Sequence, residues 1–455
     1  MASGASTLAG DGSAWRDRYR AVRRRSDHIA SLLQPEDCIV QSMPDVSPTR
    51  WHLAHTSWFF ETFVLKSIDG YQPVDPLFEY LFNSYYNTVG NQFPRDRRGL
   101  LSRPTVTQTL DYRHAVDRAM SAHADAIDDA GLHETIDIGL HHEQQHQELM
   151  WTDIKHVLSC NPMDIAIFES LPPSPKCSPT TFTRLPESIC EIGHRGEGFC
   201  FDNELPRHRV LTPDVAIADR LVTAGEYRQF IEDGGYRRPE FWLSAGWSAV
   251  QAGCWNAPLY WRLASASPVS DSPVSDSPAS NESTSTRDAT RYTLAGRRPI
   301  DDDAPITHLS YVEADAYARY VAIRDNQPVR LPTEFEWERH ASEIENGGGH
   351  PSSSAACEDD GVETVEPVGA TGDAVDLFGQ VWQWTCSSYA AYPGYRPPAG
   401  AIGEYNGKFM CNQYVLRGSS VATSPGHARM TYRNFFPHDA RWQFTGLRLA
   451  RDESS

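Results

Sequence analysis

The chain has 455 residues, in which 41 lysines and arginines stand against 60 aspartates and glutamates, and its formal net charge is −19. Such an acidic surface repels phosphate backbones, so the composition argues against nucleic acid as a partner. The length exceeds what one hydrophobic core usually organises, and about 150 residues per domain predicts two or three domains.

Nine cysteines are scattered along the chain without a Cys-x-x-Cys pair. An odd number with this spacing argues against a disulfide framework and a thiolate zinc site, and it fits a reducing cytosol. Residues 1–12 lack the pattern of a secretion signal, and no run of 18 apolar residues occurs. We therefore expect a cytoplasmic protein with no membrane partner. The sequence does not distinguish a monomer from a homo-oligomer.

Apolar residues recur at three-to-four spacing through most of the chain before Cys160, which predicts amphipathic helices. Four are expected, over 15–33, 49–67, 105–129 and 135–159. They indicate a helical bundle over 14–165, preceded by a disordered N-terminus over 1–13. A segment over 71–104, rich in Asn, Gly, Pro and Tyr, separates the second and third helices and is long enough to be a functional loop.

Short strands, tryptophans and frequent Gly and Pro follow Pro162, with helices expected only at 224–233, 311–324 and 334–343. This pattern predicts a second, α+β domain over 166–455. Within it, residues 264–290 repeat Ser-Pro-Val-Ser-Asp at 267–271 and 272–276 and carry too little apolar surface to order themselves. We expect a disordered insertion there.

The fourth predicted helix carries His142 and His146, which are four residues apart. At 3.6 residues per turn these side chains point the same way, with Cβ atoms about 6 Å apart, so both imidazoles can bind one cation. Leu149 continues the stripe, which places the pair on the face that turns into the bundle. Two structural or surface histidines are the alternative for this spacing alone.

A third ligand is available from the second predicted helix, where either His52 or His55 can reach across the bundle. Glu148 can accept the outer N–H of a ligating histidine. Three neutral nitrogens without cysteine suit zinc or iron, and the spacing does not choose between these metals.

The segment over 71–104 adds Tyr85 and Tyr86, followed by Arg95, Arg98 and Arg103. Tyrosines near an open metal site can donate a proton or an electron, and arginines can bind a substrate carboxylate through two hydrogen bonds. Aromatic packing and surface arginines are the alternative explanation.

At this point the sequence resembles the ergothioneine-biosynthesis sulfoxide synthases, in which a DinB-like four-helix bundle precedes a formylglycine-generating-enzyme-like domain with a C-type-lectin-like fold. Seven motifs covering nearly the whole chain carry the resemblance. They are Trp-His-Leu-Ala-His at 51–55, His-Glu-Gln-Gln-His-Gln-Glu at 142–148, Phe-Asp-Asn-Glu at 201–204, Val-Thr-Ala-Gly-Glu-Tyr at 222–227, Arg-Leu-Pro-Thr-Glu at 330–334, Gly-Gln-Val-Trp-Gln-Trp-Thr at 379–385 and Val-Leu-Arg-Gly-Ser-Ser at 415–420.

The resemblance implies a non-haem Fe(II) site with His55, His142 and His146 as ligands, and it sets His52 aside. It further implies that Gln145 and the pair Asn434 and Phe435 hold a trimethylammonium substrate, hercynine, in a pocket between the domains. Aromatic faces suit a quaternary ammonium, which cannot donate hydrogen bonds.

Family members that use γ-glutamylcysteine have an Asp and an Arg where this chain has Phe436 and Ala440. The resemblance therefore implies free cysteine as the sulfur donor, with Phe436 in the substrate pocket. The resemblance implies that in cysteine-using members Tyr85 or Tyr86 takes the role that a tyrosine of the C-terminal domain has in members using γ-glutamylcysteine. In this chain Tyr405 lies near the position of that C-terminal-domain tyrosine. The implied grip on the cysteine carboxylate is Arg95 or Arg98.

The expected activity is O2-dependent formation of a C–S bond between cysteine and the imidazole C2 of hercynine, with oxidation of sulfur to the sulfoxide. Alternatives within the family type are a γ-glutamylcysteine-using, an ovothiol-type (histidine) or a selenoneine-type synthase. Outside it, a zinc-dependent thiol transferase or hydrolase of the DinB type is possible, and a lectin-like binding module is the non-enzymatic alternative. Formylglycine generation is not implied, because residues 431–436 contain no cysteine.

Overall fold

The computed structural model describes residues 14–196, 198–263, 286–346, 364–369 and 376–453. The predicted disordered segment over 1–13 lies outside these residues, as does most of the predicted insertion over 264–290. The end of that insertion belongs to the fold, because Ala289 is buried and Thr290 begins strand β6 (Thr290–Thr293). The insertion was therefore predicted too long at its C-terminal end.

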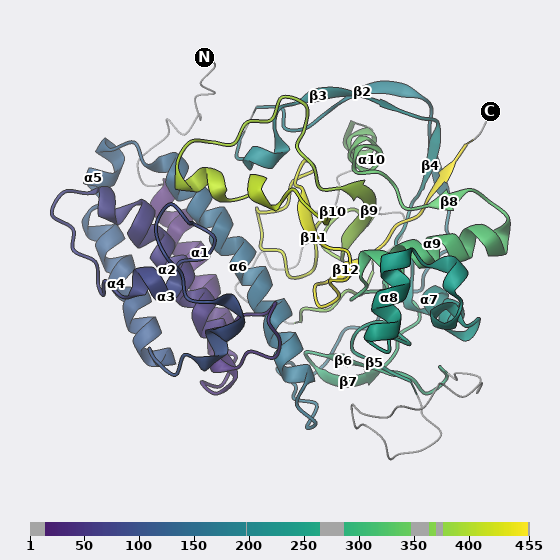
Figure 1. Ribbon diagram of the computed structural model, residues 1–455, viewed down its shortest axis with the longest axis horizontal. Coiled ribbons are helices and arrows are strands. Elements are labelled where there is room, and N and C mark those ends of the chain that lie inside the picture. The colour runs from purple at the N-terminus through teal and green to yellow at the C-terminus, as the bar shows by residue number, and fades with distance from the viewer. Residues whose placement is uncertain (1–13, 197, 264–285, 347–363, 370–375, 454–455) are drawn as a thin grey trace.

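The first part of the chain forms a helical bundle, drawn on the left of Figure 1. Its long helices are α1 (Ala14–Ser31), α2 (Thr49–Phe63), α4 (Val106–Ala122) and α6 (His133–Ser159). A short helix, α5 (Ala124–Asp129), continues the third predicted helix after a break at His123. The four predicted helices are confirmed, with their ends moved by a few residues.

Helices α2 and α6 approach closely at Gly139. A Cβ atom at this position would come within 2.7 Å of the Phe60 ring and 2.8 Å of the Phe59 ring. Glycine therefore lets two fully buried phenylalanines of α2 pack directly on the backbone of α6. This contact brings the histidine-bearing faces of α2 and α6 close together.

The segment over 71–104 contains α3 (Phe78–Phe82) and the 3-10 helix η3 (Arg95–Leu100). Its irregular backbone is tied to the bundle at both ends. Glu61 accepts hydrogen bonds from the Tyr71 hydroxyl at 2.8 Å and the Val74 N–H at 2.9 Å. Arg50 donates to the Pro104 carbonyl at 2.7 Å. These contacts hold the long segment in a fixed position, although only short helices interrupt its irregular backbone.

The second part of the chain is an α+β domain built around small sheets (Figure 1). One sheet has the order β1-β4-β13-β8 and a second has the order β11-β10-β9-β12, while β5-β6-β7 and β2-β3 form smaller ones. The remaining strand bounds are β1 (Phe182–Leu185), β2 (Ser188–Ile192), β3 (His208–Thr212), β4 (Val215–Ala218), β5 (Trp261–Arg262), β7 (Gly296–Pro299), β8 (Val329–Arg330), β9 (Trp382–Ser388), β10 (Gln413–Gly418), β11 (Asn434–Pro437), β12 (Thr445–Gly446) and β13 (Ala450–Asp452). Strand β11 forms one edge of the second sheet, so Asn434 and its neighbours lie at the margin of the domain.

The predicted helices of this domain are confirmed as α7 (Ala224–Glu232), α9 (Tyr311–Asp325) and α10 (Glu334–Asn346). Capping boxes begin two of them, at Thr223 and Ser310. A further helix, α8 (Ser244–Ala252), was not predicted. Its Gly246 hides the helical pattern, yet it lets α8 pack on α9, since a Cβ there would lie 2.8 Å from the Val312 side chain.

Helix α6 lies on the side of the bundle that faces the second domain (Figure 1). Partly buried Glu148 accepts hydrogen bonds from Trp382 at 2.6 Å, Ser420 at 2.6 Å and Thr423 at 2.8 Å. Buried Lys155 forms an ion pair with Glu366. Charged groups are buried at such a contact only when they are paired, so these partners fix how the two domains meet.

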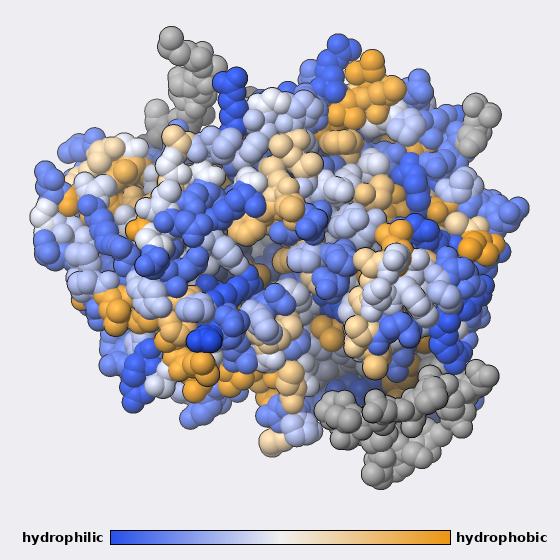
Figure 2. Space-filling view, viewed as in Figure 1, coloured by the Kyte–Doolittle hydropathy of each residue, from blue (hydrophilic) through white to orange (hydrophobic). Residues whose placement is uncertain are grey.

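Hydrophilic residues cover much of the face shown in Figure 2, in keeping with the acidic composition. Among the described residues, none of the helices combines the length and apolar character needed to cross a membrane.

Candidate metal centre and substrate cavity

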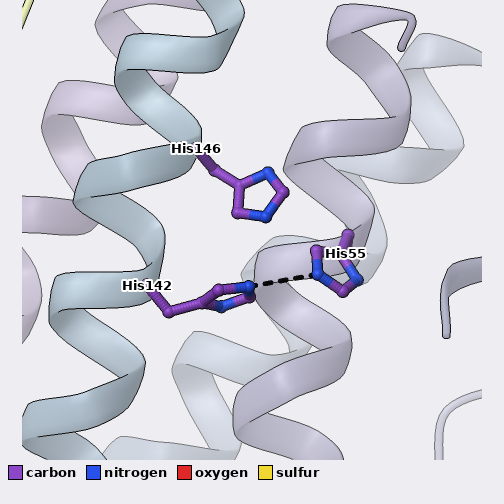
Figure 3. A group of neighbouring side chains, drawn as sticks. All are labelled: His55, His142 and His146. Carbon is purple, nitrogen blue, oxygen red and sulfur yellow. Dashed lines mark hydrogen bonds between the residues drawn. The ribbon is translucent and has the colours of Figure 1, made fainter. Parts of the chain in front are cut away.

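Three buried histidines converge between α2 and α6. His55 projects from α2, whereas His142 and His146 project from α6, and the rings face one another (Figure 3). One ring nitrogen from each lies within 4.8 Å of the others. The His142 and His146 ring centroids are 4.6 Å apart, as expected for two residues on one helical face.

The His55 ring is fixed by its surroundings. Its Nδ1 donates to the Phe82 carbonyl at 2.6 Å, and the ring stacks on Trp51 with centroids 4.6 Å apart. Because Nδ1 carries the hydrogen, Nε2 carries a lone pair, and it lies 3.1 Å from His142 Nε2. A backbone carbonyl thus orients this ring towards the cluster.

The cluster is chemically suited to a divalent metal. Burial lowers the pKa of His55 and His146 well below the usual value and lowers that of His142 to about 3. The rings are therefore neutral, which is the form that binds a cation. His142 Nδ1 is buried and has no hydrogen-bond partner among the described residues. Three neutral imidazoles without a thiolate match the donor sets of zinc and iron.

Beside the cluster lies a cavity of 310 Å³ that opens between the two domains. It falls at the lower end of the range of about 300–1,000 Å³ that is typical of ligand pockets. The site residues predicted from the sequence all line it: His55, Tyr85, Tyr86, Arg95, Arg98, His142, Gln145, His146, Asn434, Phe435 and Phe436. Residues from far apart in the chain therefore meet in one space.

The two loop tyrosines differ in their environment. Tyr86 is 3% exposed, and its ring lies 5.6 Å from that of Trp58. Tyr85 has a φ of +66°, and its hydroxyl contacts Arg95. Burial raises the pKa of Tyr86 well above its usual value, so this hydroxyl keeps its proton.

Gln145 is held between two tyrosines of the second domain. Its Oε1 accepts from the Tyr405 hydroxyl, and its Nε2 donates to the Tyr432 oxygen. The Tyr405 ring lies 5.5 Å from that of His142. Gln145 therefore connects α6, which carries two of the clustered histidines, with the opposite wall of the cavity.

Arg98 and Arg95 both line the cavity, but only Arg98 is buried. Arg98 donates to the hydroxyls of Ser47 and Ser84, each at 2.9 Å, and stacks over the Trp51 ring at 3.3 Å. It forms no ion pair with any carboxylate in the described part of the chain. Burial, followed by repulsion from Arg95, lowers its pKa to about 9, as expected for a cation that lacks a counter-ion.

Aromatic rings form the wall contributed by β11. Phe435 stacks on Tyr389 with centroids 4.1 Å apart, and Phe409 lies 5.8 Å from it. Phe436 lies 6.2 Å from Trp442. The Asn434 side chain accepts from the Phe435 N–H at 2.9 Å. This wall can receive a cation that has no hydrogen to donate.

The prediction for Glu148 is wrong. Its carboxylate accepts hydrogen bonds from Trp382, Ser420 and Thr423, and its contacts are with the second domain instead of a ligating histidine. The hydrogen-bond partner of the candidate ligand His146 is His52, whose Nδ1 lies 2.8 Å from His146 Nδ1.

Sequence reasoning missed Asp153, Tyr432 and Trp442 as cavity residues. Asp153 could have been found, because it lies two helical turns after His146 on the same face of α6. Tyr432 and Trp442 lie in irregular segments near β11 and β12, so no periodic pattern points to them.

Comparisons with known proteins agree with this architecture. Residues 18–150 match the DinB superfamily, and residues 168–453 match the Sulfatase-modifying factor enzyme 1-like domain. A hercynine oxygenase of Mycolicibacterium thermoresistibile is 28% identical over 90% of this chain and 88% of its own. One from Mycobacterium tuberculosis is 28% identical over 95% of this chain and 97% of its own. Ergothioneine biosynthesis protein 1 of Schizosaccharomyces pombe is 22% identical, but it matches over 56% of this chain and 28% of its own.

Proposed function

Since the chain belongs to the ergothioneine-biosynthesis sulfoxide synthases, the family of the hercynine oxygenases, we propose that it joins cysteine to hercynine with Fe(II) and O2. Hercynine is N-α-trimethylhistidine, and the new bond links its imidazole C2 to the cysteine sulfur. The product is the sulfoxide conjugate. The observation that carries the proposal is the single cavity in which three histidines, a buried arginine and an aromatic wall meet.

The reaction balances with one O2. Joining a C–H carbon to an S–H sulfur releases two electrons and two protons, and oxidation of that sulfur to the sulfoxide releases two more electrons. One oxygen atom of O2 becomes the sulfoxide oxygen, and the other leaves as water. The task of the protein is therefore to hold both organic substrates in one orientation while O2 is reduced.

His55, His142 and His146 would hold the iron, leaving open positions beside the cavity. When bound, Fe(II) supplies the activation of O2 and the deprotonation of the cysteine thiol. The donor set alone suits zinc as well, so iron belongs to the proposal through the oxygenase family and the need to reduce O2.

For the cysteine carboxylate we assign Arg98. It is buried, it lacks a carboxylate partner among the described residues, and a substrate anion would compensate its charge. Arg95 is exposed and already contacts Tyr85 and the Asp45 carbonyl, which makes it the weaker candidate.

Free cysteine, in preference to γ-glutamylcysteine, is supported by two features. Phe436 lines the cavity where a glutamyl group would need a charged partner, and Ala440 is buried. A cavity of 310 Å³ must also hold hercynine at the same time. The wall formed by Asn434 and Phe435, together with Gln145, is assigned to hercynine, because aromatic faces attract a quaternary ammonium.

We assign the hydroxyls of the loop tyrosines to directing the reaction towards the sulfoxide conjugate. A protonated phenol beside the reacting oxygen favours C–S bond formation over plain dioxygenation of cysteine, and Tyr86 is the better placed of the loop pair because it is buried in the cavity wall. Tyr405 holds Gln145 from the opposite wall and is assigned to positioning hercynine.

The direct test uses iron-loaded protein with hercynine, cysteine and air, followed by mass spectrometry of the product. We expect the sulfoxide conjugate and consumption of one O2 per conjugate. Replacing cysteine by γ-glutamylcysteine should lower the rate, and a much faster reaction with the dipeptide would overturn the assignment of the donor. Metal-dependent turnover of a thiol with neither O2 consumption nor the conjugate would instead favour a zinc-dependent thiol transferase.

A cytoplasmic location completes the proposal. All cysteines in the described part of the chain are free thiols, which suits a reducing compartment.

A further inference from the structure

His52 links a proposed metal ligand to a carboxylate. Its Nδ1 lies 2.8 Å from His146 Nδ1, and its Nε2 lies 3.1 Å from Asp153 Oδ2. His52 is 2% exposed, Asp153 3% and His146 9%, so solvent does not compete for these hydrogen bonds. The three side chains form a buried row between α2 and α6.

The partners of Asp153, at one end of this row, determine which atoms donate and which accept in its hydrogen bonds. Asp153 Oδ2 accepts from the Ser47 backbone N–H at 2.8 Å, and Oδ1 accepts from Trp442 Nε1 at 3.2 Å. Both of these partners can only donate, so both carboxylate oxygens act as acceptors. His52 Nε2 must then be the donor to Asp153, and Nδ1 of a neutral His52 is left as an acceptor.

An acceptor at His52 Nδ1 requires a donor at His146 Nδ1. The hydrogen of His146 is therefore on Nδ1, and its Nε2 carries the lone pair that a cation needs. Both nitrogens of His52 are occupied in this arrangement, which removes His52 as a ligand and gives it a different task.

We propose that His52 and Asp153 are positioning residues that fix the tautomer and ring orientation of His146 and thereby set the affinity for the metal. This inference rests on the metal site of the proposed function. Hydrogen-bond partners of ligating histidines raise metal affinity by holding the lone pair in place. Here a second histidine stands between the ligand and the carboxylate.

The row also involves the second domain, because Trp442 is the donor to Asp153 Oδ1. Docking of that domain on the bundle thus helps to orient a histidine of the bundle. The proposal predicts that the metal affinity of the full chain depends on residues that never touch the metal.

The test compares two variants of nearly equal size, His52→Gln and His52→Leu, in the full chain. Glutamine can accept a hydrogen bond from His146 Nδ1, whereas leucine cannot. Metal-free protein is titrated with Co(II) without substrates, and visible absorption reports both binding and ligand geometry. We expect His52→Leu to bind Co(II) roughly 10–100-fold more weakly with an altered spectrum. His52→Gln should stay within about threefold of the parent, as expected when the acceptor is kept.

Asp153→Asn provides a third variant, at the other positioning residue. Asparagine replaces one of the two accepting oxygens with an NH2 group that only donates, so it cannot accept from Ser47, His52 and Trp442 together, and His52 loses its fixed direction. Metal binding should weaken here too. In the double variant with His52→Leu the loss should not exceed that of His52→Leu alone, because Asp153 acts through His52.

Three results would overturn the proposal. They are unchanged Co(II) binding in His52→Leu, equal losses in the glutamine and leucine variants, and additive losses in the double variant. Circular dichroism of the metal-free proteins verifies folding, and His52→Gln keeps the test valid if the leucine variant does not fold. Because Co(II) binding is measured without substrates, its outcome is independent of whether the enzyme forms the sulfoxide.

Discussion

Arg98 offers the sharpest test of how the enzyme selects its sulfur donor. The perturbation is Arg98→Met, which keeps the length and apolar contact of the side chain and removes its charge and its donors. In the proposed complex the guanidinium of Arg98 binds the carboxylate of cysteine. The variant should therefore lower kcat/KM for cysteine but leave kcat/KM nearly unchanged for a thiol without a carboxylate. Cysteamine is such a thiol.

The magnitude follows from burial. Arg98 is 3% exposed, so a hydrogen bond from its guanidinium to a carboxylate is shielded from water and salt. Net contributions of hydrogen bonds to charged groups are about 1.5–3 kcal/mol. A loss of about 3 kcal/mol, at about 1.4 kcal/mol for each factor of ten, predicts a fall of roughly 100-fold in kcat/KM for cysteine.

The assay measures kcat/KM for cysteine and for cysteamine with saturating hercynine, and the result is the ratio of the two. In the parent protein cysteine should be preferred by about 100-fold, and in Arg98→Met the preference should nearly vanish. Arg95→Met is the matched control, because Arg95 lines the same cavity but is exposed; its ratio should change by less than about fivefold. An unchanged ratio in Arg98→Met, with metal content intact, would refute the assignment.

Four further outcomes are expected. Tyr86→Phe should shift products from the sulfoxide conjugate towards cysteine sulfinate, and Tyr85→Phe should do so less; unchanged product ratios in both, by mass spectrometry, would reject the steering role. Removal of the metal by a chelator should abolish activity and lower the melting temperature, and Fe(II) should restore both. A ligand at 100 times its Kd adds about 2.7 kcal/mol to the free energy of unfolding. A melting temperature that does not respond to metal would contradict the proposed metal site. Glu404 accepts hydrogen bonds from the Thr88 N–H at 2.9 Å and from the Thr88 hydroxyl at 2.5 Å. Each hydrogen bond to the charged carboxylate contributes about 1.5 kcal/mol, so Glu404→Ala should speed amide hydrogen exchange near Thr88 about tenfold. Equal exchange rates in the variant and the parent would show that this contact does not hold the loop. Burial lowers the pKa of Lys155 to about 8, whereas an unfolded lysine titrates at about 10.4, so between these pH values the unfolded state binds more protons and the free energy of unfolding should rise with pH. Lys155→Met should lose that rise. An equal slope of the free energy of unfolding against pH in the variant would show that the rise does not come from Lys155.

The convergence of two histidines on α6 could be predicted from the sequence because the geometry of a helix is local. His142 and His146 are four residues apart, and their convergence needs only helical periodicity. The choice between His52 and His55 could not be made in this way. Both lie on α2 one turn apart, and what separates them is the partner of each ring, the Phe82 carbonyl for His55 and Asp153 for His52.

Residue patterns predicted the fold class of the second domain, whereas its contribution to the site was expected only through the resemblance. Strand β11 is short, and its place beside the bundle follows from pairing with β10, in which Val415 lies opposite Phe435 and Leu416 opposite Asn434. Such long-range pairing leaves no periodic trace in the sequence, so the cavity wall could be inferred only through the resemblance.

Helix α6 explains why the cavity needs both domains. Its Glu143 points into the bundle and binds Arg23 and Arg113, while Glu148 points to the second domain. Because Glu143 and Glu148 each accept hydrogen bonds from a different side of α6, exposing either side to water would remove those partners. The bundle can supply the histidines and Gln145, but the wall of Asn434 and Phe435 assigned to hercynine comes from the second domain. Binding of hercynine should therefore require the docked pair of domains.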